Sequence, residues 1–229
     1  MNLPGKDDYI DIHDHDPVPA RGKFTVRNLM AHEEDEPDMT DKMTYSIGIH
    51  PWYLSMQNFE KQLEKIRRFS DHPNIIALGE AGFDRLKGPD AGLQKSVFSE
   101  QVLISEDSQK PLFIHCVRAW EDLFAASRLH KPLMPWIIHG FRGKKELAAQ
   151  LISKNMFISF WFDFIVRPES SALVRSIPAE KIFLETDGSG YDISLIYRKV
   201  AEDLSMNLDE LKEQIYNNFH RVFIRRNSV

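Results

Sequence analysis

Short apolar segments recur along the chain, and most of them are rich in β-branched or aromatic residues. Segments that are nearly continuous in apolar character are typical of strands buried on both faces of a parallel sheet. The pattern predicts eight such strands, at residues 9–13, 24–30, 43–49, 74–80, 111–115, 135–139, 156–160 and 181–187. An α/β protein is therefore the expected fold class.

Apolar residues at helical spacing separate the later strands and close the chain. This spacing predicts helices over residues 59–69, 93–104, 193–204 and 208–222. Asn207 followed by Glu210 resembles a capping box that opens the last of these helices. The crossovers between the later strands can therefore be helical.

Strand and helix alternate from about residue 43, and this alternation with eight strands predicts a single-domain TIM-like (β/α)8 barrel over residues 1–229. The first third departs from this pattern. About ten residues separate the first two strands, fewer than a parallel crossover usually needs. We therefore expect a bare loop or an antiparallel turn there, and a barrel that is irregular or trimmed in its first third.

The composition of the chain predicts the cellular compartment of the protein. Hydrophobic residues make up 42% of the chain and charged residues 28%, which is typical of a soluble globular protein, and no apolar window is long enough to cross a bilayer. The N-terminus lacks the pattern of a signal peptide, and the single cysteine, Cys116, is compatible with a reducing compartment. We expect a cytoplasmic monomer. The net charge of -5 argues against a general attraction to polyanions, although basic loops or a bound metal could reverse the sign locally.

Ligand-type side chains collect at the carboxyl ends of the predicted strands. The set is His13, His15, Glu80, His115, His139 and Asp187. Strand ends of a barrel converge on one rim, where active sites of this architecture are built. A single buried histidine is more often an ordinary core residue than a ligand, but the joint placement of imidazoles and carboxylates favours a divalent metal site. Two residues apart on an extended segment, the first two histidines share a face and can bind one ion.

Seven motifs run in order along nearly the whole chain. They are IDIHDH at 10–15, GIHPWYL at 48–54, ALGEAGFD at 77–84, KPLFIH at 110–115, IIHGFRG at 137–143, FLETD at 183–187 and YNNFHRVF at 216–223. This series resembles the TatD-type metal-dependent hydrolases, which are relatives of the amidohydrolase barrels. The resemblance implies a TIM-like barrel with one or two divalent ions (Mg, Mn or Zn) that hydrolyses phosphoester bonds, in many members as a deoxyribonuclease.

The same resemblance implies a role for each matching residue. His13, His15 and Asp187 would bind the first ion, and His115 and His139 would bind the second. Glu80 would bridge the two ions. Glu80 and Asp187 are the catalytic candidates, with Asp187 as the general base. His50 either contacts a substrate phosphate or orients its own loop.

The substrate is less constrained than the metal ligands. Arg118 and Arg142 lie in loops after ligand-bearing strands and could position phosphates, together with His50. The acidic run at residues 32–38 would repel a long polyanion if it faced the same rim. Compared with the family, the segment between His15 and Gly48 is shorter, and a helix follows Asp187 within a few residues. DNA, a short oligonucleotide and a small phosphoester therefore all remain open as substrates.

Two other functions compete with phosphoester hydrolysis. The first is an amidohydrolase that acts on an amide or lactone, although that superfamily often supplies a metal-bridging lysine where this chain offers Glu80. The second is a metal-binding scaffold that has lost its activity with the shortened loops. All six ligand positions remain filled, which favours an enzyme.

Overall fold

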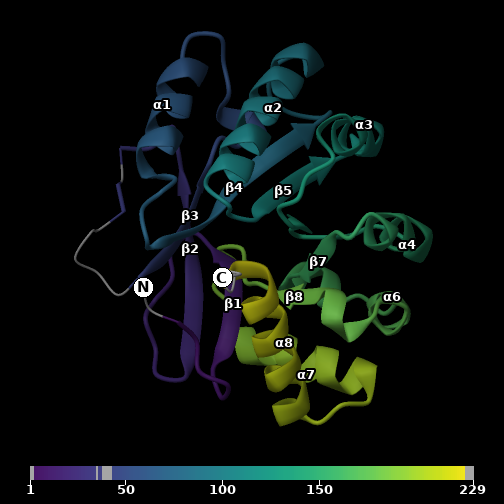
Figure 1. Ribbon diagram of the computed structural model, residues 1–229. Helices are drawn as coiled ribbons and strands as arrows, with labels where there is room; N and C mark the ends of the chain where they lie inside the picture. Colours follow the sequence, from purple (N-terminus) through teal and green to yellow (C-terminus); the bar gives the residue numbers. More distant parts are fainter. Residues whose placement is uncertain (1–2, 35, 38–42, 225–229) are drawn as a thin grey trace. The chain divides into compact units, whose positions relative to one another are not determined.

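The computed structural model describes residues 3–34, 36–37 and 43–224 (Figure 1). Its eight strands follow one another in the sheet in chain order, from β1 to β8. The contacts between residues divide the chain into two compact units. Residues 28–137 form the first unit, and the segments before and after them form the second. Asp35 and Asp38 of the predicted acidic run lie outside the described residues. No helix in the described part of the chain combines the length and apolar character needed to cross a membrane.

The first unit contains the strands that carry Glu80 and His115. Its elements are β3 (Thr44–Gly48), η1 (Pro51–Tyr53), α1 (Phe59–Phe69), β4 (Ile75–Asp84), α2 (Ala91–Asp107), β5 (Leu112–Val117) and α3 (Trp120–His130). The three strands pair in parallel, and α1 buries the apolar face predicted from its spacing, including Leu63 and Ile66. Asp90 begins α2 by accepting hydrogen bonds from the backbone N–H groups of Gly92 and Leu93, at 2.8 and 3.2 Å.

The second unit contains both ends of the chain that the structure describes. Its elements are β1 (Tyr9–Asp14), most of β2 (Lys23–Met30), the end of β6 (Trp136–Ile138), α4 (Lys145–Ser153), β7 (Phe157–Phe160), α5 (Phe162–Ile165), α6 (Ser170–Arg175), η2 (Ala179–Lys181), β8 (Ile182–Leu184), α7 (Ile193–Leu204) and α8 (Leu208–Phe223). The capping box predicted for the last helix is present: the Glu210 N–H donates to Asn207 Oδ1 at 2.9 Å, and the Asn207 N–H donates to Glu210 Oε2 at 2.8 Å. In Figure 1 the two terminal helices, α7 and α8, lie side by side in yellow-green and yellow.

The connection between the first two strands is the bare loop that the short spacing allowed. β1 and β2 pair in parallel, with Tyr9 opposite Lys23, and residues 15–22 between them contain no helix. The antiparallel alternative is wrong. The chain returns from the end of β1 to the start of β2 through this loop, without a helix.

One strand extends beyond its predicted end. The prediction placed Glu80 at the end of its strand, but β4 continues four residues further to Asp84, pairing Gly82 with His115 and Phe83 with Cys116. A Cβ atom on Gly82 would lie 1.9 Å from the His115 carbonyl oxygen, so glycine is required for this close approach. Glycine at this position permits the pairing of β4 with β5 beyond the predicted end of the strand at Glu80.

Candidate metal centres

The first candidate centre lies in the second unit, where β1 meets the segment that follows β8. The Asp187 N–H donates to the His13 carbonyl oxygen at 3.0 Å, which brings the two segments together. Asp187 Oδ1 lies 3.6 Å from His13 Nε2 and 3.4 Å from His15 Nε2. His13 is fully buried, while His15 and Asp187 are partly exposed to solvent. The three predicted ligands of the first ion therefore converge on one partly open site.

The backbone of Asp187 is held in an unusual conformation. Its φ angle of 51° lies in the left-handed region, which side chains other than glycine seldom adopt. Strain of this kind persists only where surrounding contacts hold it, and it collects at functional sites. The turn after β8 thus directs the Asp187 carboxylate toward the two histidines.

Asp11 hydrogen-bonds to Thr186, the residue before Asp187. Its Oδ2 accepts a hydrogen bond from Thr186 Oγ1 at 2.6 Å and lies 3.6 Å from Lys23 Nζ, and its Oδ1 accepts from the Thr186 N–H at 3.1 Å. Burial raises the pKa of Asp11 to about 7, against the opposing effects of Lys23 and Thr186. These contacts tie the β1 strand to the residue that precedes Asp187.

His139 lies beside the same group and contacts a carboxylate that the sequence analysis did not select. The His139 ring lies 4.8 Å from the His13 ring, and its Nδ1 lies 3.2 Å from Glu185 Oε1. That oxygen also accepts a hydrogen bond from the Gly140 N–H at 2.6 Å. Glu185 is fully buried, and no described residue hydrogen-bonds to its Oε2.

These donors fit a divalent cation. Ligand atoms that share an ion at about 2.1 Å lie roughly 3.0–3.4 Å from one another, close to the separations between Asp187 and the two histidines. His139, Glu185 and Asp187 also offer ligand atoms within 4.8 Å of one another. A buried carboxylate oxygen without a described partner is costly unless a cation compensates it. Imidazole with carboxylate is a donor set suited to Mn or Zn.

The second candidate centre lies in the first unit and joins Glu80, His115 and His50. Glu80 Oε1 lies 2.8 Å from His115 Nδ1 and 3.1 Å from His50 Nε2, and the two imidazole nitrogens are 3.3 Å apart. All three residues are buried. His50 also accepts a hydrogen bond at Nδ1 from the Trp52 backbone N–H, at 3.0 Å, so it orients its loop and joins the group at once.

A further carboxylate, Asp84, contacts this group from the end of β4. Its Oδ2 lies 3.1 Å from His115 Nε2 and accepts a hydrogen bond from the Trp52 indole Nε1 at 2.6 Å. Its Oδ1 accepts from the N–H groups of Leu86 and Lys87, at 2.7 and 3.0 Å. Burial pushes the pKa of Asp84 upward, but these hydrogen bonds outweigh it and leave the pKa below its usual value.

The predicted ligands thus form groups within each unit. Three of them, His13, His15 and Asp187, come together as predicted for one ion, with His139 beside them. Glu80 and His115 come together with His50. The predicted bridge from Glu80 to the first ion, and the pairing of His115 with His139, would join residues of different units and remain predictions.

The two arginines predicted to bind substrate lie in exposed loops. Arg118 directly follows β5 and is exposed, with a φ angle of 51°. Arg142 places its guanidinium 4.4 Å from the Trp161 ring and forms an ion pair with Asp163 at 3.2 Å. Contact of either arginine with substrate remains a prediction.

The sequence analysis missed Asp84, Glu185 and Trp52. Asp84 was hidden because the strand seemed to end at Glu80, and Glu185 because only the last residue of FLETD was weighed as a ligand. A usable signal existed for both, since each lies two to four residues from a predicted ligand on the same strand or strand end. Trp52 had no local signal, because its role depends on a contact with a residue 32 positions away.

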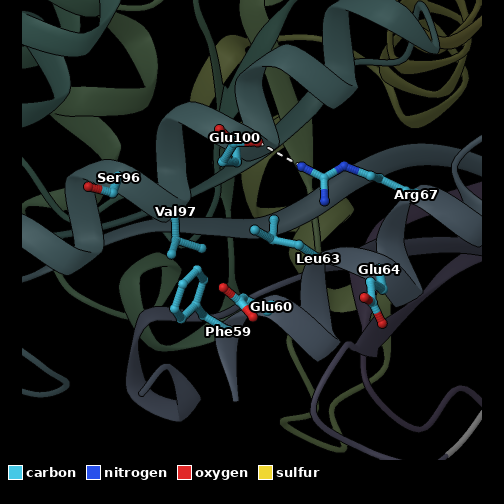
Figure 2. Close-up of a pocket in the computed structure, with 8 residues that line it drawn as sticks. All are labelled: Phe59, Glu60, Leu63, Glu64, Arg67, Ser96, Val97 and Glu100. Atoms are coloured by element: carbon cyan, nitrogen blue, oxygen red, sulfur yellow. Dashed lines mark hydrogen bonds and ion pairs between the residues drawn. The ribbon is translucent and has the colours of Figure 1, made fainter. Parts of the chain in front are cut away.

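A separate hollow of about 440 Å³ lies between α1 and α2 (Figure 2). Phe59, Leu63 and Val97 form its apolar part, and Arg67 pairs with Glu100 at 2.7 Å. Glu60 and Glu64 add further negative charge. With no histidine in its lining and an excess of carboxylates, this hollow suits neither a metal centre of the kind above nor a polyanion.

Comparison with known proteins agrees with the motifs and the fold. The sequence model of the TatD-related DNase family matches residues 26–224. A curated relative, the deoxyribonuclease Tat-D of Schizosaccharomyces pombe, is 29% identical over 157 residues, which cover 63% of this chain and 50% of that protein. The uncharacterized metal-dependent hydrolase YcfH of Escherichia coli K12 is 26% identical over 210 residues, covering 84% of this chain and 78% of that one.

A solved structure is similar over nearly the whole chain. The crystal structure of a hydrolase TatD family protein from Entamoeba histolytica superimposes with a TM-score of 0.76 at 14% identity, covering 98% of this chain and 99% of that one. The predicted fold class is confirmed as an α/β barrel of eight parallel strands of the TIM type. The sequence matches show the family: this chain belongs to the TatD-related DNase family of metal-dependent hydrolases.

Proposed function

We propose that this protein is a divalent-metal-dependent hydrolase of phosphoester bonds, and that its substrate is DNA or a short oligonucleotide. The observation that carries the proposal is the convergence of His13, His15 and Asp187 on one partly open site, in a chain of the TatD-related DNase family. When bound there, a divalent cation supplies Lewis-acid charge that lowers the pKa of water and neutralises charge on phosphoryl oxygens.

The chain's own residues would divide the remaining work. His13 and His15 hold the cation with the Asp187 carboxylate, and Asp187 also accepts the proton of the attacking water. Its partial exposure supports this role, because a proton acceptor must reach both the water and the substrate. Glu80 and His115 would supply further cation ligands, and the exposed Arg118 would neutralise a substrate phosphate. His50, whose Nδ1 accepts the Trp52 N–H, would donate from Nε2 instead of binding the cation.

The test is cleavage of end-labelled single-stranded DNA by the purified full chain, with Mg, Mn and Zn supplied separately. The proposal expects cleavage that requires added metal and that chelation abolishes. Asp187→Asn should reduce the rate by at least about 100-fold, because the variant keeps the size of the side chain but loses a proton acceptor. His130→Asn is the control: His130 lies at the end of α3, with Nε2 3.0 Å from Ser99 Oγ and outside both candidate centres, and the variant should retain the wild-type rate.

Two outcomes would overturn the proposal. Metal-dependent hydrolysis of an amide or lactone panel without phosphoester cleavage would identify an amidohydrolase. Bound metal without single-turnover cleavage of any phosphoester would identify a scaffold. An Asp187→Asn variant with full activity would contradict the assignment of the base even if DNA is cleaved.

A further inference from the structure

The Asp84 carboxylate accepts hydrogen bonds from three N–H groups and lies against one imidazole nitrogen. Oδ1 receives the backbone N–H groups of Leu86 and Lys87, and Oδ2 receives the Trp52 indole N–H while lying 3.1 Å from His115 Nε2. A carboxylate accepts at both oxygens and donates at neither, so it matches the three N–H groups and is best matched by a proton on His115 Nε2. The side chain is also held in place, because its partners come from three separate segments, at residues 52, 86–87 and 115, and it is 3% exposed.

His115 presents its two ring nitrogens to different partners. Nδ1 faces Glu80 Oε1 and His50 Nε2, at 2.8 and 3.3 Å, whereas Nε2 faces Asp84 alone among these carboxylates. A neutral imidazole carries one proton, and the nitrogen that donates it cannot also bind a metal. With the Asp84 carboxylate as the acceptor at Nε2, the proton of His115 lies on Nε2, and Nδ1 keeps its lone pair.

We propose that Asp84 is a positioning residue for the second candidate centre, where it holds His115 as the Nε2–H tautomer and presents Nδ1 to a divalent cation shared with Glu80. This inference rests on the metal dependence proposed above. Carboxylates behind metal-binding histidines fix ring orientation and raise ligand basicity, and their removal typically costs about 10–100-fold in metal affinity.

Trp52 contacts both Asp84 and the two histidines of this centre. Its indole N–H donates to the same oxygen that faces His115, and its ring packs edge-to-face against both histidines, with centroids 4.8 Å from His50 and 5.7 Å from His115. Trp52 thus anchors Asp84 from the loop that also carries His50. Removing the indole N–H leaves the carboxylate in place, so Trp52→Phe should perturb His115 less than Asp84→Asn does.

The experiment measures zinc affinity of the full chain by competition with a chromophoric chelator. Asp84→Asn keeps the shape of the side chain but turns an amide N–H₂ toward a donor, and we expect its zinc affinity to fall at least tenfold. Trp52→Phe should lose less than Asp84→Asn. Asp122→Asn is the matched control, because Asp122 is a buried carboxylate of the same unit that pairs with Lys95 at 2.9 Å and with Arg85, and it should stay within about threefold of the wild type.

A second measurement needs no variant. In zinc-loaded wild-type protein labelled with ¹⁵N-histidine, long-range ¹H–¹⁵N spectra should show His115 protonated at Nε2 and not at Nδ1. The opposite tautomer would overturn the inference, as would an Asp84→Asn affinity within threefold of the wild type or an equal loss in Trp52→Phe. Wild-type protein that binds no zinc would instead refute the proposed function, and the positioning role would fall with it.

Discussion

Tyr197 satisfies both backbone groups of a buried strand residue. Its hydroxyl accepts a hydrogen bond from the Ile10 N–H and donates one to the Ile10 carbonyl oxygen, each at 3.0 Å. Both residues are fully buried, and burial raises the pKa of the Tyr197 phenol well above its usual range, so the hydroxyl stays protonated. Ile10 lies three residues before His13 on β1, so this contact fixes the strand that carries the first ligand.

Tyr197→Phe removes the hydroxyl and leaves the ring in place. The Ile10 N–H and C=O would then be buried without this partner, at about 1–3 kcal/mol for each group. The variant no longer buries a hydroxyl, which offsets part of that cost. We therefore expect the free energy of unfolding to fall by about 2–4 kcal/mol.

Urea unfolding of the metal-free protein, followed by far-UV circular dichroism, measures this difference. Tyr216→Phe is the control, because Tyr216 is only partly buried on α8, and it should change the free energy by less than about 0.5 kcal/mol. A Tyr197→Phe loss as small as that of the control would refute the reasoning, since it would mean that Ile10 finds other partners without cost.

Three further predictions concern charge, burial and capping. Burial lowers the pKa of Lys110 to about 8, with Nζ bound to the carbonyl oxygens of Ser70 and His72. Between about pH 8 and 10.5 the unfolded chain therefore binds more protons than the folded chain. Across this window the unfolding free energy of the wild type should rise with pH relative to that of Lys110→Met, by roughly 1–3 kcal/mol. A difference between the two proteins that does not depend on pH would contradict this prediction. Glu185→Gln should raise the melting temperature of the metal-free protein, because it removes a buried carboxylate, and it should weaken zinc binding. A lower melting temperature with unchanged zinc affinity would show that the carboxylate is compensated without metal. Asn207→Ala should cost about 1 kcal/mol in urea unfolding through loss of the capping box, and Asn217→Ala on the exposed face of α8 should cost less than half as much, so equal losses would exclude a capping effect.

Much of the first candidate centre was predictable because it depends on short-range geometry. Residues two apart on an extended segment share a face, so His13 and His15 had to point the same way, and the structure directs both toward Asp187. Parallel strands align their carboxyl ends, which explains why residues distant in sequence meet in each unit. The capping box was equally local, since Asn207 and Glu210 satisfy one another across a single turn.

The groups behind the ligands were not predictable, because they depend on pairing and on long-range contacts. The predicted strand ended at Glu80, yet β5 pairs with the following residues and extends β4 to Asp84. The left-handed backbone of Asp187 follows from its contacts with β1 rather than from its own preferences. Glu185 was ambiguous because a buried carboxylate beside a ligand can either bind a cation or hold another ligand, and sequence spacing does not separate the two.

The central claim is that His13 and His15 hold a catalytic divalent cation with Asp187. Equilibrium dialysis against Mn²⁺, with elemental analysis of the full chain, tests it most directly when the wild type is compared with the His13→Ala/His15→Ala double variant. The account predicts that the wild type retains at least one ion per chain and that the double variant loses one, with circular dichroism confirming that both are folded. Equal retention by the two proteins, or no retention by the wild type, would contradict it.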